Sequence, residues 1–255
     1  MIALDGRVAI VTGAAQGLGA AIAQALCAAG ARVIVADIAQ PAWDHAKAVF
    51  QRTDLAEDAD IDACVTATCD NAGRLDILVN CAVTYLDNGL ASTRAEWHRA
   101  LDVNLIGAML LTARATARMT RGGVVVNIGS VGGKFGAAGR MLYPAAKAAL
   151  LQLTRTLAVT LAPRGIRVLS ISPAWTWSPA LERMAGSEAR ADAVGARVHP
   201  LGRVGRGEDV ARAVLFACSD LAGFVTGTDI AVDGGFSALG PDAGRGPRAW
   251  FAEGG

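Results

Sequence analysis

The chain has 255 residues, of which 53% are hydrophobic and 18% are charged, and its formal net charge at pH 7 is +1. This composition predicts one large domain with an ample core, and it lacks the basic excess that is typical of nucleic-acid-binding proteins. The five cysteines lack Cys-x-x-Cys spacing and the three histidines lack metal-ligand spacing, so we expect reduced buried thiols and no metal. Asp5 and Arg7 precede any long apolar run, and no uncharged stretch would span a bilayer. We therefore expect a cytoplasmic protein with neither nucleic acid nor a membrane as partner.

The amino-terminal segment has the pattern of a dinucleotide site. Val8 to Val11 is a short β-branched run that predicts a buried strand, and an alanine-rich helix is predicted from Gly17 to Ala29. In the loop between them, glycines let the backbone approach a pyrophosphate, and the helix amino terminus offers N–H groups to it. The predicted cofactor contacts in this loop are Gly13, Gln16, Gly17, Leu18 and Gly19.

The second predicted strand, Arg32 to Ala36, is followed directly by Asp37. An acidic residue about 20 positions beyond the glycine loop is placed to accept hydrogen bonds from the adenosine ribose hydroxyls. A 2′-phosphate there would meet like charge, and neither Gln16 nor Ile38 supplies a compensating cation. The pattern predicts NAD rather than NADP, although Asp37 in the alternative interpretation merely starts a loop.

The next predicted elements alternate between helix and strand. They are a short helix from Trp43 to Ala48, a strand from Val49 to Thr53, a helix from Glu57 to Ala72 and a strand from Leu75 to Asn80. Asp54 would then lie at the end of the third strand beside the adenine. Asn80 would end the fourth strand near the cofactor, unless it forms a turn.

A long helix is predicted from Arg94 to Thr120, with Thr93 as its amino-terminal cap. This helix carries Asn104 in its interior, where asparagine lowers helix propensity. The asparagine therefore either faces solvent or has a polar role inside the protein.

The stretch from Ser130 to Lys147 carries the chemistry. Ser130 follows the apolar run Val124 to Ile128, so its hydroxyl would emerge at the carboxyl end of a buried strand and bind a substrate oxygen. Tyr143 and Lys147 lie four residues apart on a helix predicted from Met141 to Leu161, which places both on one face. A nearby ammonium lowers the pKa of a phenol and makes it a usable general acid or base, although two such residues can also align by coincidence.

The remaining elements complete the alternation. They are a strand from Ile166 to Ile171, a helix from Glu208 to Ser219 and a strand from Asp229 to Val232. Strands that alternate with helices predict an α/β fold with a single Rossmann-type, doubly wound parallel sheet of about seven strands and helices on both faces. Residues 1–239 would form the NAD-binding domain, and residues 240–255 a Gly/Pro-rich tail.

Together these motifs make the sequence resemble the short-chain dehydrogenase/reductase family over residues 5–237. The matching motifs are Thr12-Gly13-x-x-x-Gly17-x-Gly19, Asp54-Leu55, Asn104 in Val-Asn-Leu, Ser130, Tyr143-x-x-x-Lys147, Pro200-Leu201-Gly202-Arg203 and Val232-Asp233-Gly234-Gly235. The resemblance implies a small-molecule substrate and a homotetramer or homodimer built through the two long helices. It also implies that Asp54 and Leu55 belong to the cofactor site.

The resemblance further implies a catalytic tetrad. In it, Tyr143 is the acid/base, and Lys147 lowers the pKa of the tyrosine and holds the nicotinamide ribose. Ser130 polarises the substrate oxygen, and Asn104 anchors a water of the proton relay, which would explain an asparagine inside a helix. Tyr143 and Lys147 would thus contact the cofactor as well as the substrate.

The sequence departs from the family pattern in three places. Asn80 is followed by Cys81-Ala82-Val83 where the family usually has Asn-Ala-Gly, which restricts the backbone at Val83. Pro173 is followed by alanine instead of glycine, and Ser178 stands where a threonine often binds the carboxamide of the nicotinamide. We still expect Pro173 and Ser178 to contact the cofactor.

The substrate pocket is expected to be apolar or aromatic. Trp175 and Trp177 alternate in the loop after the sixth strand, so they would share one face of an extended segment. The predicted lining is Tyr85, Phe135, Met141, Trp175, Trp177 and Met184. In the alternative, these side chains pack the loop against the protein or a neighbour.

These features predict NAD-dependent interconversion of a hydrophobic, possibly ring-bearing secondary alcohol and its ketone. The alternatives are an NADPH-dependent 3-oxoacyl reductase, which Asp37 disfavours, and a nucleotide-sensing protein without turnover, which would not need the tetrad. For the tail, the hypotheses are disorder and a crossing to a partner subunit, where Trp250 and Phe251 would close the pocket.

Overall fold

Seven short apolar runs form one parallel β-sheet in the computed structural model, which describes residues 2–240, 244 and 247–253. The strands are β1 (Val8–Thr12), β2 (Arg32–Asp37), β3 (Ala48–Arg52), β4 (Ile77–Asn80), β5 (Val124–Ile128), β6 (Arg167–Pro173) and β7 (Asp229–Val232). Their order is β3-β2-β1-β4-β5-β6-β7, and every pair is parallel. The predicted doubly wound α/β fold is confirmed.

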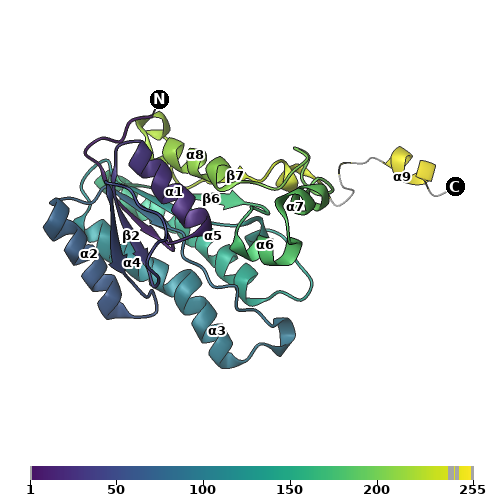
Figure 1. Cartoon of the computed structure of the whole chain (residues 1–255), viewed down its shortest axis with the longest axis horizontal. Helices are drawn as coiled ribbons and strands as arrows, with labels where there is room; N and C mark the ends of the chain where they lie inside the picture. Colours follow the sequence, from purple (N-terminus) through teal and green to yellow (C-terminus); the bar gives the residue numbers. More distant parts are fainter. Residues whose placement is uncertain (1, 241–243, 245–246, 254–255) are drawn as a thin grey trace.

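Helices cover both faces of the sheet (Figure 1). The helices α1 (Gly17–Ala28) and α8 (Gly207–Cys218) lie on one face, and α2 (Asp58–Ala72), α4 (Gly107–Arg118) and α5 (Leu142–Leu161) lie on the other. Successive side chains along a strand point to opposite faces of the sheet, so each strand contributes to the core on both sides. Ala9 and Val11 pack with α1, whereas Ile10 packs with α2. Because both faces are covered, the central strands β1, β4 and β5 are mostly apolar and fully buried, whereas the edge strand β3 ends in Gln51 and Arg52.

The sheet order reverses between β1 and β4, and the carboxyl ends of these strands meet there. In sheets of this kind ligands bind in the crevice at this switch point. The Thr12 hydroxyl accepts hydrogen bonds from the backbone N–H groups of Cys81 and Ala82, each at 3.0 Å, so the loops after β1 and β4 are held together. Ser130, the predicted catalytic residue that follows β5, lies at this same edge of the sheet.

One predicted helix is wrong, and a second is present but contains a π-helical turn. The segment Trp43–Ala48 is not helical, because its side chains bond elsewhere: the Trp43 indole donates to Ala14 O at 3.0 Å, and His45 Nδ1 accepts from Lys47 N at 3.1 Å. The single helix from Arg94 to Thr120 is instead three segments, α3 (Arg94–Leu101), a π-helical turn (Asp102–Ile106) and α4. The cap at Thr93 is confirmed, and forms a capping box with Glu96.

Three further helices were not predicted. They are α6 (Pro179–Ala185), α7 (Glu188–Gly195) and α9 (Pro247–Glu253). The first two follow β6 and lie beside the active-site edge of the sheet, and α9 lies beyond α7 in Figure 1, away from the sheet. Among the helices that the structure describes, none is both long and apolar enough to cross a membrane. The Trp250 side chain lies outside the described residues, and Phe251 on α9 is exposed.

Candidate active site

The glycine-rich loop between β1 and α1 has the shape that a dinucleotide pyrophosphate requires. A Cβ atom on Gly13 would lie 2.6 Å from the Cα of Ala82, and one on Gly19 would overlap the carbonyl oxygen of Gly13. Gly17 has φ +57°, a conformation that favours glycine. Gln16 precedes α1 without capping it, so the first N–H groups of that helix are free of side-chain acceptors. The loop therefore fits the predicted phosphate site, with Leu18 in the first turn of the helix.

Asp37 lies at the end of β2, directly over this loop. Its carboxylate accepts hydrogen bonds from Ala15 N at 2.9 Å and from Ala39 N at 3.0 Å, one on each oxygen. Each oxygen keeps a second lone pair, which is available to a ribose hydroxyl. The carboxylate is thus held in one orientation beside the glycine loop rather than free in a surface turn.

Asp54 and Leu55 follow β3 at the same edge of the sheet. The Asp54 carboxylate accepts from Ala56 N at 3.0 Å and lies 3.5 Å from the Arg99 guanidinium. Leu55 is buried, and its carbonyl oxygen would overlap a Cβ atom on Gly107. The pair therefore fixes the start of α4 against the end of β3.

Asn80 ends β4 and points its amide into the protein, and its predicted place near the cofactor stays a prediction. Its Nδ2 donates to Thr112 Oγ1 at 2.9 Å and to Asn127 Oδ1 at 2.8 Å, and Asn127 Nδ2 donates to Thr154 Oγ1 at 2.9 Å. The two asparagines are opposite each other in the register of β4 and β5. This buried chain joins both strands to α4 and α5, because each amide needs a partner once it leaves water.

Ser130, Tyr143 and Lys147 come together as the sequence predicts. Ser130 follows β5 and is 8% exposed, and a Cβ atom on Gly132 would lie 3.3 Å from its Oγ and 3.4 Å from the Tyr143 ring. The Lys147 ammonium lies 5.8 Å from the Tyr143 ring centroid, and it donates to the Ile128 carbonyl at 2.7 Å. The serine hydroxyl and the tyrosine ring thus lie close together at the end of β5, where a substrate oxygen can bind both side chains.

The predicted direction of the Tyr143 pKa is wrong for the protein alone. Burial raises the pKa of the phenol, and this outweighs the hydrogen bond from Ser130 and the positive charge of Arg140, which both lower it. Burial also lowers the pKa of Lys147 to about 8, because the ammonium is 3% exposed and has no carboxylate beside it. The lysine bonds to a backbone carbonyl, not to the phenol.

Asn104 lies in the π-helical turn between α3 and α4, and it is buried. Its Oδ1 accepts from Thr84 N at 2.7 Å and its Nδ2 donates to Thr84 O at 2.9 Å. Its polar role is therefore internal: it holds the loop after β4 that carries Tyr85. Single π turns inside helices occur frequently at functional sites, which fits this position.

Two charged residues at the site were missed from the sequence. Asp87 accepts hydrogen bonds from Met141 N at 2.9 Å and Tyr143 N at 3.2 Å, so its carboxylate caps the amino terminus of α5. The Arg140 guanidinium lies over the Tyr143 ring, 5.1 Å from its centroid. Arg140 lies in the loop before α5, so its place over the ring depends on the fold of that loop and has no signal in the sequence.

The loop after β6 brings the predicted tryptophans onto one strand-like segment. Trp175 O accepts from Gly205 N and Trp177 N donates to Gly205 O, both at 2.8 Å, so the segment is extended. Ser178 caps α6 by accepting from Leu181 N at 3.3 Å. The side chain of Pro179, the first residue of α6, approaches Gly17 of the glycine loop. Pro173 and Ser178 therefore border the predicted cofactor path.

The predicted pocket residues are only partly gathered. Tyr85 contacts Tyr143, with ring centroids 5.2 Å apart, whereas Trp175 packs edge-on against His199. Phe135 contacts Phe236 instead of the catalytic residues. Trp177 is half-buried in the extended segment. Met141, just before α5, and Met184, on α6, are exposed. Trp175 and Phe135 thus fit the alternative interpretation, in which these side chains pack against other parts of the protein.

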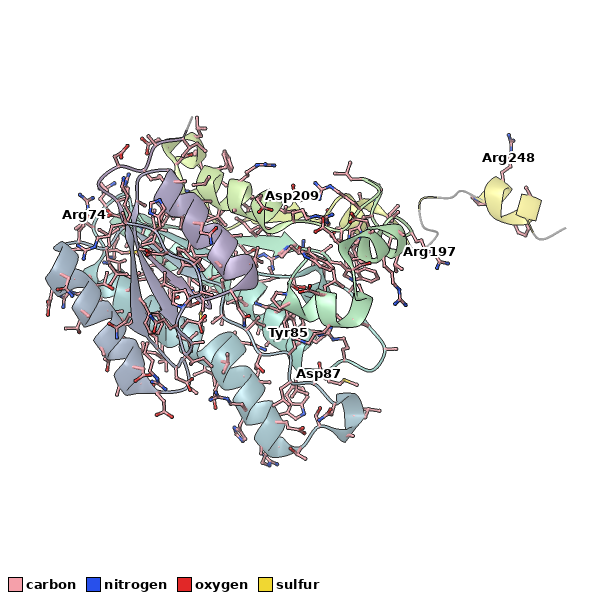
Figure 2. The ribbon with its side chains drawn as sticks, in the orientation of Figure 1. Arg74, Tyr85, Asp87, Arg197, Asp209 and Arg248 are labelled. Carbon is pink, nitrogen blue, oxygen red and sulfur yellow. The ribbon has the colours of Figure 1, made fainter. Side chains whose placement is uncertain are left out.

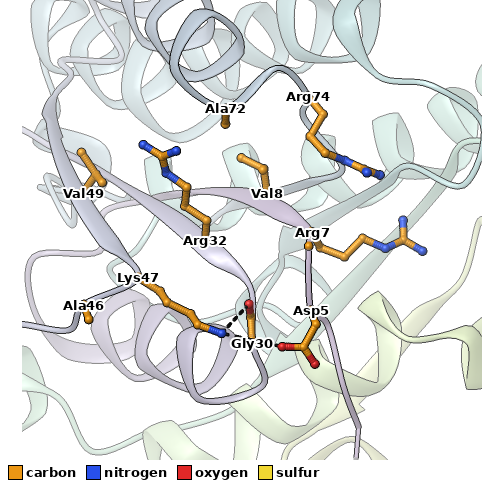
Figure 3. Close-up of a pocket in the computed structure, with 11 residues that line it drawn as sticks. Asp5, Arg7, Val8, Gly30, Arg32, Ala46, Lys47, Val49, Ala72 and Arg74 are labelled. Atoms are coloured by element: carbon orange, nitrogen blue, oxygen red, sulfur yellow. Dashed lines mark hydrogen bonds and ion pairs between the residues drawn. The ribbon is translucent and has the colours of Figure 1, made fainter.

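A basic cleft at the other end of the molecule is separate from this site. It has a volume of about 580 Å³ and is lined by residues that include Arg7, Arg32, Lys47 and Arg74 (Figure 3). Lys47 Nζ donates to Gly30 O and Arg32 to Asn71 O. Arg7 and Arg74 pair with Asp76, and Lys47 also pairs with Asp5, so these cations have partners within the protein. Figure 2 places Arg74 far from Tyr85 and Asp87. No cluster that could hold a metal occurs among the described residues.

Comparisons with known proteins agree with this geometry. A family model described as "Enoyl-(Acyl carrier protein) reductase" matches residues 13–237. The chain is 38% identical to cis-4-hydroxycyclohexanecarboxylate dehydrogenase of Sinomonas cyclohexanicum over 91% of this chain and 97% of the relative. The chain belongs to the short-chain dehydrogenase/reductase family. Dehydrogenases of this family use a nicotinamide cofactor, as the glycine loop and Asp37 indicate here.

Other members of the family match over nearly the same length. The 2,5-dichloro-2,5-cyclohexadiene-1,4-diol dehydrogenase of Sphingobium indicum is 35% identical over 92% of this chain and 99% of the relative. The ligand-free structure of aldohexose dehydrogenase from Thermoplasma acidophilum superposes with a TM-score of 0.86 at 32% identity, covering 93% of this chain and 96% of that chain. The protein is thus an oxidoreductase of this family, related to dehydrogenases that act on CH–OH groups.

Proposed function

We propose that this protein is an NAD-dependent dehydrogenase that interconverts a hydrophobic, ring-bearing secondary alcohol and its ketone. The observation that carries the proposal is the gathering of Ser130 and Tyr143 beside Gly132, with the Lys147 ammonium 5.8 Å from the tyrosine ring centroid, at the same edge of the sheet as the glycine loop. Relatives named for a hydroxycyclohexanecarboxylate and for a cyclohexadiene diol support a ring-bearing alcohol.

In this mechanism the substrate hydroxyl binds between Ser130 and Tyr143. The phenolate of Tyr143 takes the hydroxyl proton while the hydride leaves the carbinol carbon. A nicotinamide cofactor held by the glycine loop and Asp37 would supply the hydride acceptor. Ser130 donates a hydrogen bond to the oxygen as it becomes a carbonyl, and Asn104 keeps the Thr84–Tyr85 loop in place.

The positive charges around the phenol favour its phenolate form. Arg140 and Lys147 lie 5.1 Å and 5.8 Å from the ring centroid, although burial still holds the pKa of the phenol above its ordinary value in the protein alone. The pKa of Lys147 of about 8 keeps most of the ammonium charged at neutral pH.

The preference for NAD rests on Asp37. A 2′-phosphate near this fixed carboxylate would place like charges a few ångströms apart, and such juxtapositions cost several kcal/mol. The test compares NAD and NADP with a panel of cyclic, aryl and aliphatic secondary alcohols, followed by the absorbance of the reduced cofactor. We expect turnover with NAD, and for Asp37→Asn a smaller preference for NAD. A preference for NADP in the wild-type protein would identify the reductase alternative, and cofactor binding without any turnover would favour the sensing alternative.

We also propose that the protein forms a homotetramer or homodimer through α4 and α5. Val159 on α5 is 78% exposed and Ile106, just before α4, is 45% exposed, so both helices present apolar side chains to solvent. Light scattering of the wild-type protein and of Val159→Glu tests this: a monomer in the wild type, or an unchanged assembly in the variant, counts against this interface.

A further inference from the structure

An arginine without a partner lies at the mouth of the active site. Arg140 is exposed, and its guanidinium lies over the Tyr143 ring, 5.1 Å from the ring centroid. Among the residues that the structure describes, no carboxylate pairs with this guanidinium and no carbonyl accepts a hydrogen bond from it. Other arginines near this edge differ, since Arg203 pairs with Asp209 and Arg206 with Asp192.

Asp87 bonds to the backbone of Met141, the residue after Arg140, but it does not pair with the Arg140 guanidinium. Asp87 accepts hydrogen bonds from the backbone of Gly89, Met141 and Tyr143, and this bonding lowers its pKa. Lys147, the other cation at the site, is buried and bonded to the Ile128 carbonyl. The site therefore presents one solvent-facing cation with its donors unused, beside the catalytic phenol.

A guanidinium in this position is suited to one kind of ligand group. Stacked on an aromatic ring, it keeps its in-plane N–H donors free, and their planar fork matches a carboxylate with two parallel hydrogen bonds. The carbinol oxygen of a substrate must lie about 2.6–3.2 Å from the phenol oxygen for proton transfer. The phenol oxygen belongs to the ring whose centroid lies 5.1 Å from the guanidinium carbon, so a small substrate that carries both a carboxylate and a carbinol can reach both groups.

We infer that Arg140 binds a carboxylate of the substrate, so that the reacting alcohol is a small hydroxy acid with both groups on one compact, ring-sized framework. This inference rests on the proposed dehydrogenase function and names its substrate class. The name of the Sinomonas relative, a hydroxycyclohexanecarboxylate dehydrogenase, contains both groups on one ring. Arg140 is thereby a specificity-determining residue, while proton transfer remains with Tyr143.

The experiment compares an acid with its uncharged analogue. Wild-type protein, Arg140→Gln and the control Arg118→Gln are assayed with 4-hydroxycyclohexanecarboxylate and with the corresponding carboxamide, with NAD as cofactor. Arg118 is an exposed arginine at the end of α4, so its variant carries the same change in net charge. We expect wild type and Arg118→Gln to favour the acid by about 10- to 100-fold in kcat/KM, and Arg140→Gln to lose that preference mainly through KM.

The carboxamide separates recognition from catalysis. Arg140 also acts on the phenol, so its variant changes turnover of both substrates, and only the ratio between acid and amide reports carboxylate binding. In parallel, cyclohexanecarboxylate, which has no hydroxyl to oxidise, is titrated calorimetrically into the three proteins saturated with NADH. Weaker binding to Arg140→Gln alone is the expected result.

The outcomes distinguish the inference from the proposed function. Equal use of acid and amide by the wild type, or a preference that survives in Arg140→Gln, overturns the role of Arg140 and leaves the dehydrogenase intact. Absence of turnover with Arg140-dependent binding of cyclohexanecarboxylate overturns the proposed function and supports the carboxylate site. Absence of both overturns both.

Discussion

The buried ammonium of Lys147 makes the stability of the protein depend on pH in a defined direction. Lys147 is 3% exposed, its Nζ bonds only to the Ile128 carbonyl at 2.7 Å, and burial lowers its pKa from 10.5 to about 8. The folded state therefore loses this proton near pH 8, whereas the unfolded chain keeps it up to its ordinary pKa. Between these values the unfolded state holds more protons, so stability rises with pH.

The size of the effect follows from the shift. One pKa unit is worth about 1.4 kcal/mol, so a buried charged Lys147 costs the folded protein about 3 kcal/mol below pH 8, and most of this is regained by pH 10. Lys147→Met removes the charge and keeps the apolar stem. We expect the difference in unfolding free energy, variant minus wild type, to be about 2 to 3 kcal/mol more positive at pH 7 than at pH 10, so that the variant is relatively more stable at pH 7.

The assay is urea unfolding of wild type and Lys147→Met at several pH values from 7 to 10, with equal m-values as the check that both unfold alike. Other groups also titrate in this pH range, but their contributions cancel when the unfolding free energies of variant and wild type are subtracted at each pH. Lys47→Met removes a lysine that lies at the surface, and so controls for the loss of one positive charge. If the difference in unfolding free energy between Lys147→Met and wild type does not change with pH, the reasoning is refuted.

Three further predictions address other parts of the site. Gly19→Ala should weaken NADH binding by about tenfold or more without unfolding the protein, because the added Cβ displaces the Gly13 carbonyl; unchanged fluorescence titrations contradict this. Burial raises the pKa of Cys81 to about 11, so its thiol should resist iodoacetamide at pH 8 until urea unfolds the chain, and labelling of the native protein detected by mass spectrometry counts against it. Deletion of residues 241–255 should change KM or assembly if the tail closes a neighbouring pocket, and unchanged values of both exclude that role.

The strands and the catalytic pair could be predicted because they depend on short-range patterns. A parallel strand covered on both faces is a nearly continuous apolar run, so the runs Val8 to Val11 and Val124 to Ile128 predict strands directly. Tyr143 and Lys147 share a helix face by their spacing alone. The parallel direction of the strands then brings their carboxyl ends to one edge, and the reversal of strand order opens the crevice there.

The features that were missed depend on contacts between distant residues. The π turn around Asn104 is stabilised by Thr84, 20 positions away, and one additional residue in a helix leaves almost no trace in the apolar pattern. Asn80 turns inward because Asn127 lies opposite it across two strands. Arg140 gains its role from the position of the Tyr143 ring, which the sequence does not specify.

The central claim is that the Tyr143 hydroxyl transfers the proton, and Tyr143→Phe tests it by removing one oxygen. The measurement is single-turnover reduction of NAD with the best alcohol, alongside NADH affinity by fluorescence. We predict a loss of about 100- to 10,000-fold in the rate of the chemical step, with NADH affinity and thermal stability close to wild type. A variant that retains wild-type turnover with its cofactor bound would contradict the account, since the proton would then leave by another route.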